Sequence, residues 1–98
     1  RGMRQRLALE RALLHDPRLI LLDEPFTGLD EMATVALTDR LLGLKRSGCM
    51  VLVATHDLDI ADEFVDRSVM LRNGKMVKLD GEFGSLRERY RVALVKDN

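Results

Sequence analysis

Two short apolar runs separated by a long amphipathic stretch dominate the hydrophobic pattern of the chain. The runs cover residues 19–22 and 50–54, and neither is interrupted by a polar residue. Such runs are typical of parallel strands that are covered on both faces. Between them, apolar residues recur at helical spacing over residues 31–47. The pattern predicts a β-α-β unit, in which a right-handed crossover leaves the two strands parallel.

The helix over residues 31–47 has recognisable signals at both ends. Asp30 precedes it and, as an N-cap, can accept hydrogen bonds from the first free N–H groups. Lys45 and Arg46 favour the negative end of the helix dipole, and Gly48 suits the stop. The apolar stripe of this helix is expected to be core: Ala33, Leu37, Leu41 and Leu44.

Two further helices are predicted on either side of the β-α-β unit. Residues 1–16 are expected to form a helix that stops at Asp16, because the residue before Pro17 avoids the helical conformation. Asp57 follows the second strand and is expected to cap a short helix.

The residue pattern over the last third of the chain predicts a hairpin followed by a helix. Residues 68–77 form the hairpin around Asn73-Gly74, since both positions tolerate a positive φ. Ser85 and Glu88 form a capping box at the start of an amphipathic helix that packs on its own domain.

Composition limits the range of functions. The chain has 98 residues, 46% of them hydrophobic, which is enough for one domain or part of one. Its 16 basic and 16 acidic residues cancel, so no overall field favours nucleic acid or an anionic membrane. The single cysteine, Cys49, excludes an internal disulfide and is expected to be a small buried hydrophobe.

Candidate chemistry lies where the two strands end. Asp23 and Glu24 follow the first strand directly, and His56 follows the second. Open α/β sheets bind ligands at the carboxyl ends of their parallel strands. Successive side chains of a strand point to opposite faces, so one carboxylate can address a metal while the next orients a water. The alternative is a strand that simply ends at a polar turn.

Four motifs occur in order and resemble the second half of the nucleotide-binding subunit of ATP-binding-cassette (ABC) transporters. Residues 1–9 resemble the end of the signature motif and its helix, and residues 19–24 resemble the Walker B strand. Residues 27–30 match the D-loop, and residues 55–57 match the histidine switch. The resemblance implies an α/β fold: the C-terminal part of a P-loop NTPase nucleotide-binding domain, with parallel strands, helices and a terminal antiparallel hairpin. It implies that residues 1–80 belong to that domain and residues 81–98 form an amphipathic helical tail.

The resemblance also implies roles for individual residues. Asp23 would hold magnesium through water, and Glu24 would be the base or water-positioning group for attack on the γ-phosphate. His56 would contact that phosphate. Three further residues would face the ATP of the opposite subunit or the dimer interface: Gly2, Met3 and Asp30. The family pattern is most often Gly-Gly-Gln where this chain has Arg-Gly-Met, so the backbone role of the glycine is kept and side-chain contacts there differ.

An ATPase subunit of an ABC transporter, with ATP and Mg²⁺ as cofactors, is therefore the expected function. Its partners would be a second ATP-binding subunit and a transmembrane permease, without nucleic acid, and it would lie on the cytoplasmic side of the cell membrane as a peripheral protein. The motif residues look most like exporter cassettes, with the haem exporter of cytochrome c maturation and polysaccharide or drug exporters nearest. Soluble members of the superfamily, acting on ribosomes or in DNA repair, are the alternative.

No phosphate-binding loop of the form G-x-x-x-x-G-K-[ST] occurs in the 98 residues, where the single Gly-Lys pair, Gly74-Lys75, is followed by Met76. That loop supplies the N–H cradle and the lysine that hold the phosphates. The chain is therefore expected to be a C-terminal fragment that is inactive by itself. Strands without their parallel neighbours would leave unpaired edges and exposed apolar faces, so marginal stability is also expected.

Overall fold

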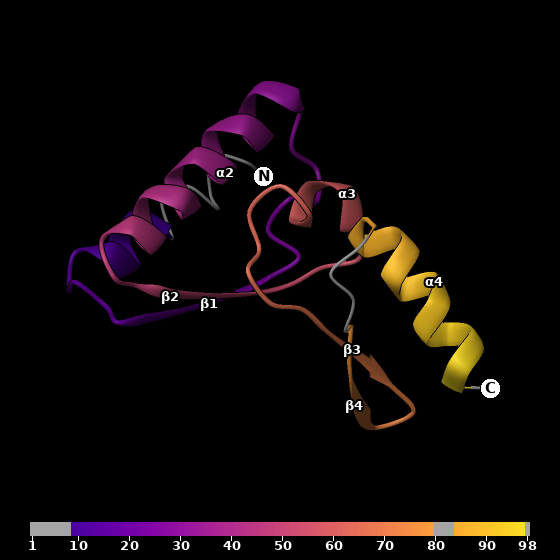
Figure 1. Ribbon diagram of the computed structural model, residues 1–98. Helices are drawn as coiled ribbons and strands as arrows, with labels where there is room; N and C mark the ends of the chain where they lie inside the picture. The colour runs from indigo at the N-terminus through magenta and orange to yellow at the C-terminus, as the bar shows by residue number, and fades with distance from the viewer. Residues whose placement is uncertain (1–8, 80–83, 98) are drawn as a thin grey trace. The chain divides into compact units, whose positions relative to one another are not determined.

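The computed structural model describes residues 9–79 and 84–97, and its elements follow the predicted order (Figure 1). The chain folds as two compact units, residues 1–56 and residues 57–98. Within the described ranges, no helix combines the length and the apolar character needed to cross a bilayer.

The first unit is the predicted β-α-β unit. Strand β1 (Leu19–Asp23) pairs in parallel with β2 (Met50–Ala54), in a register that runs from Leu19 opposite Met50 to Asp23 opposite Ala54. Helix α2 (Glu31–Arg46) connects the two strands and packs along them (Figure 1). The parallel register brings the carboxyl ends of both strands to the same edge.

Local signals set the ends of α2 as predicted. The Asp30 carboxylate accepts a hydrogen bond from the Ala33 N–H at 2.7 Å, so it is the N-cap. In the expected stripe, Leu41 is completely buried and Leu44 nearly so, whereas Ala33 and Leu37 are half-buried. Cys49, just before β2, is buried as expected.

Only one face of the β1–β2 pair is covered among the described residues. Ile20 is buried and Leu22 half-buried on the side of the helices, whereas Leu21 and Leu52 on the other side are 66% and 59% exposed. The prediction that both faces are covered is thus wrong here, because α2 and the helical residues 9–13 lie on the same side and strand side chains alternate. The expectation of exposed apolar faces on these strands is confirmed.

The N-terminal helix ends earlier than predicted. Residues 9–13 are helical, and the Asp16 N–H donates to the Leu13 carbonyl at 3.2 Å. Asp16 has a φ of 45°, a left-handed conformation that frequently terminates helices and here precedes Pro17. The part of the prediction over residues 1–8 lies outside the described residues.

The second unit begins with the predicted short helix and hairpin. Asp57 caps α3 (Leu58–Ala61) by accepting from the Ile60 N–H at 3.2 Å. Strands β3 (Val69–Arg72) and β4 (Lys75–Lys78) pair antiparallel. Both central residues of the turn, Asn73 and Gly74, have positive φ, as a tight hairpin turn of this kind requires.

Helix α4 (Leu86–Asp97) completes the core of the second unit. The Ser85 hydroxyl accepts a hydrogen bond from the Glu88 N–H at 3.2 Å, as the capping box predicts. Its inner face joins α3 and the hairpin in one apolar cluster: Ala61, Met70, Leu79, Leu86 and Ala93 are buried, and Tyr90 and Leu94 pack against them. The expected division into a domain over residues 1–80 and a tail over residues 81–98 remains a prediction.

An ion pair between α3 and α4 predicts a pH-dependent contribution to stability. Arg87 binds Asp59 through Nη2–Oδ2 at 2.9 Å and Nε–Oδ1 at 3.2 Å. The side-chain hydrogen bond from Arg87, followed by its charge, lowers the pKa of Asp59 below its ordinary value of 3.8. Because the folded carboxyl then has the lower pKa, the stability from this pair is present above the unfolded pKa and is lost as pH falls through the folded value.

We therefore expect Asp59→Asn to lower the melting temperature slightly at pH 7, and this difference from wild type to shrink toward zero in acid. Circular dichroism melts at both pH values would measure it. A difference that is the same at both values would contradict the assignment, and added salt should weaken the effect because the pair is exposed.

Candidate active site

The end of β1 turns sharply at Glu24. Its N–H donates to the Ala54 carbonyl at 2.7 Å, so the strand ladder continues one residue beyond Asp23. Glu24 has a φ of 47°, which is rare for a residue with a side chain. Such conformations persist where the surrounding structure holds them, and they gather at functional sites. Here the turn brings the Glu24 side chain to the residues that follow β2.

Both oxygens of the Glu24 carboxylate are held by two consecutive residues. Oε1 accepts a hydrogen bond from the His56 backbone N–H at 2.9 Å and lies 2.5 Å from the His56 Nδ1. The Thr55 hydroxyl donates to Oε2 at 3.2 Å. The predicted base and the predicted histidine are therefore in direct contact.

These contacts favour the ionised form of Glu24. The hydrogen bond with the His56 side chain is the largest cause that lowers the pKa of Glu24 below its ordinary value, and burial opposes it. The Thr55 hydroxyl and the His56 N–H act in the same direction as the ring. The Glu24 side chain is 32% exposed and the imidazole is fully exposed. An ionised carboxylate beside an accessible imidazole can accept a proton from water and orient it.

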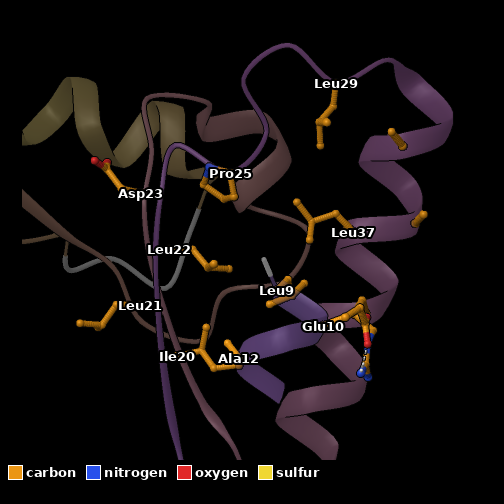
Figure 2. Close-up of a pocket in the computed structure, with 13 residues that line it drawn as sticks. Leu9, Glu10, Ala12, Ile20, Leu21, Leu22, Asp23, Pro25, Leu29 and Leu37 are labelled. Carbon is orange, nitrogen blue, oxygen red and sulfur yellow. Dashed lines mark hydrogen bonds and ion pairs between the residues drawn. The ribbon is translucent and has the colours of Figure 1, made fainter. Parts of the chain in front are cut away.

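Asp23 lies on the other side of the strand. Figure 2 shows its carboxylate pointing away from the apolar side chains of Leu22 and Leu37, on the same side of β1 as Leu21. The Asp23 side chain is exposed, and its carboxylate makes no hydrogen bond or ion pair with the residues that the structure describes. The described part of the chain contains no group of three acidic, histidine or cysteine side chains placed to hold a metal. One free carboxylate still fits magnesium, which keeps most of its waters and takes one or two protein oxygens beside substrate phosphates.

Asp30, the other predicted site residue that the structure describes, takes no part in this contact. Asp30 uses its carboxylate to cap α2. Gly2 and Met3 lie outside the described residues. The structure therefore brings together Glu24 and His56 from the predicted set.

Sequence reasoning missed Thr55, although it selected the motif that contains it. The available signal was a hydroxyl residue directly after β2. Thr55 comes one residue after Ala54, just as Glu24 comes one residue after Asp23, the residue that pairs with Ala54.

A cavity of about 430 Å³, also missed by sequence reasoning, lies between β1, α2 and the helical residues 9–13 (Figure 2). Its lining is mostly apolar, and a two-point ion pair stands at its edge, with Arg40 Nε 3.0 Å from Glu10 Oε1. Neither Glu24 nor His56 lines this cavity, so it is distinct from the carboxylate–histidine contact.

No protein-family model matches the chain. It is 41% identical over 104 residues to the aliphatic sulfonates import ATP-binding protein SsuB of Mycobacterium avium, a match that covers 96% of this chain and 41% of that protein. It is 39% identical over 94 residues to a fluoroquinolones export ATP-binding protein of Mycobacterium tuberculosis, covering 94% and 31%. The ABC-type transporter ATP-binding protein EcsA of Bacillus subtilis is 39% identical over 90 residues, covering 92% and 36%. The chain thus spans less than half the length of these relatives.

Solved structures resemble the chain over nearly its whole length. The ATP-binding subunit of an ABC transporter superposes with a TM-score of 0.79 at 36% identity, covering 96% of this chain and 43% of that one. The protein cbiO1 of Clostridium perfringens, part of the ABC transporter complex cbiONQ, superposes with a TM-score of 0.72 at 27% identity, covering 96% and 36%.

Proposed function

Because the chain belongs to the family of ABC transporter ATP-binding subunits, we propose that it is part of an ATPase that powers transport across a membrane. Its α/β fold is that of the ABC-type nucleotide-binding domain, as predicted. The observation that carries the proposal is the contact between Glu24 and His56 at the carboxyl ends of the two parallel strands.

Glu24 is the proposed base that orients the attacking water. Its carboxylate is ionised at neutral pH, since its pKa lies below an ordinary value that is already acidic, and its contact with His56 fixes one oxygen. Phosphoryl transfer requires mainly positioning and neutralisation of charge, so a carboxylate held in one orientation is suited to the task. The exposed His56 ring is then available to contact the γ-phosphate.

Asp23 is the proposed residue that holds magnesium, through water. When bound, the ion would supply positive charge that neutralises the phosphates of ATP. The exposure of Asp23 and the lack of a partner for it among the described residues support this role. Gly2, Met3 and Asp30 are proposed to face the ATP of a second subunit or the interface with that subunit.

The proposed partners are a second ATP-binding subunit and a transmembrane permease, with the protein peripheral on the cytoplasmic side of the membrane. The matched relatives include both import and export proteins. The finer proposal of an exporter rests on the resemblance of residues 2–7 and 22–30 to exporter cassettes. The 98 residues contain no phosphate-binding loop, so we propose that they do not hydrolyse ATP alone.

A chimera tests the proposal. Residues 1–98 would replace the matching segment of the Mycobacterium avium relative, which supplies the rest of the domain. We expect Mg²⁺-dependent ATP hydrolysis by the chimera and none by the 98-residue chain. In the chimera, Asp23→Asn is expected to raise the Mg²⁺ concentration needed for half-maximal rate, because a carboxylate oxygen is lost. Hydrolysis by the isolated chain, or an unchanged Mg²⁺ requirement in Asp23→Asn, would contradict these assignments.

A further inference from the structure

The pairing of the two strands places Thr55 beside the end of β1. Asp23 lies opposite Ala54, and the Glu24 N–H bonds to the Ala54 carbonyl at 2.7 Å. The residue directly after β2 is Thr55, whose hydroxyl donates to the Glu24 Oε2 at 3.2 Å. Thr55 is half-buried, and its β-branched side chain has few allowed rotamers. The restricted rotamers of Thr55 therefore hold its hydroxyl toward the Glu24 carboxylate.

We propose that Thr55 is a positioning residue that fixes the rotation of the Glu24 carboxylate. The proposal rests on the proposed function, in which Glu24 orients the attacking water.

The need for such a residue follows from the torsions of a glutamate side chain. The last torsion, which turns the carboxylate about its own axis, is broad and has no sharp minimum. His56 contacts Oε1 through its N–H and its ring, but both contacts meet at one atom. A second contact at Oε2 is required to define the plane of the carboxylate, and Thr55 provides it. Without it, the carboxylate rotates about Oε1, which misdirects the water and misaligns the hydrogen bond from the His56 N–H.

The first test uses amide hydrogen exchange of His56 in the 98-residue chain. Thr55→Val removes the hydroxyl at nearly constant shape, and Thr55→Ser keeps it. Thr38→Val is the matched control, because the Thr38 hydroxyl is buried and has no hydrogen-bond partner in the described part of the chain.

We expect Thr55→Val to speed exchange of the His56 amide by up to about tenfold, which corresponds to partial loss of one hydrogen bond to a charged group. Thr55→Ser and Thr38→Val should exchange at the wild-type rate. Equal exchange in Thr55→Val and wild type would overturn the proposal.

The second test measures ATP hydrolysis in the chimera described above. Thr55→Val is expected to lower kcat by about tenfold with KM for ATP unchanged, because misdirected water affects the chemical step and not binding. Thr55→Ser should restore kcat, and Thr38→Val should leave it unchanged.

Two outcomes separate this inference from the proposed function. If Glu24→Gln abolishes hydrolysis while Thr55→Val keeps the wild-type kcat, the role of Thr55 is wrong and the proposed function stands. If Glu24→Gln retains activity, the proposed function itself fails. Equal losses in Thr55→Val and Thr55→Ser would also overturn the proposal, since a hydroxyl that fixes the carboxylate is present in serine.

Discussion

Glu24→Gln is expected to reduce kcat for ATP hydrolysis by roughly 10²–10⁴-fold in the chimera, the range associated with loss of a positioned general base. Glutamine has nearly the same shape as glutamate, so its side chain can still reach Thr55 and His56, although it carries no charge. The carboxylate that accepts the water proton is lost, however, and an amide cannot replace it. Steady-state hydrolysis with saturating ATP and Mg²⁺ would measure the effect.

The binding of ATP provides the control for this variant. Because Glu24 is expected to act on the water and not on the phosphates, the dissociation constant for ATP should remain close to that of the parent chimera. A matched exchange at an exposed acid of α2, Glu31→Gln, should leave kcat unchanged. If Glu24→Gln hydrolyses ATP within a factor of about three of the parent, below the range for a general base, Glu24 is not the base.

Leu41→Ala is expected to destabilise the first unit by about 2–5 kcal/mol, the range for a buried leucine replaced by alanine. Leu41 lies on the inner face of α2 and is completely buried. Its truncation removes apolar contacts and leaves a cavity that the surrounding side chains fill only in part. Because one face of β1–β2 is exposed, the first unit buries little apolar surface, and a further loss of burial should lower its stability markedly. Urea denaturation of the 98-residue chain, followed by circular dichroism, would measure the loss.

Met32→Ala is the matched control on the same helix. Met32 is 84% exposed, so its truncation should change the free energy of unfolding by less than about 0.5 kcal/mol. Equal destabilisation by the two substitutions would show that α2 does not pack through the face that contains Leu41.

The elements that short-range signals specify were predicted well from the sequence. The Asp30 cap is a contact between residues three apart, and the hairpin turn depends on the conformational tolerance of Asn73 and Gly74. The parallel pairing of the two apolar runs followed from their connection through one helix. The residue types at the ends of these strands also sufficed to select Asp23, Glu24 and His56 as candidates.

Tertiary structure alone decided how these residues meet. The carboxylate of Glu24 contacts residues 31 and 32 positions away in sequence, and its φ of 47° cannot be derived from the apolar run over residues 19–22 that precedes it. The ion pair of Glu10 with Arg40 joins residues 30 apart. Likewise, strand residues of equal hydrophobicity differ in exposure because the helices cover one face. Local sequence specifies conformation over a few residues, whereas the partner of a side chain depends on how distant elements pack, which is why the role of Thr55 became visible only in the folded chain.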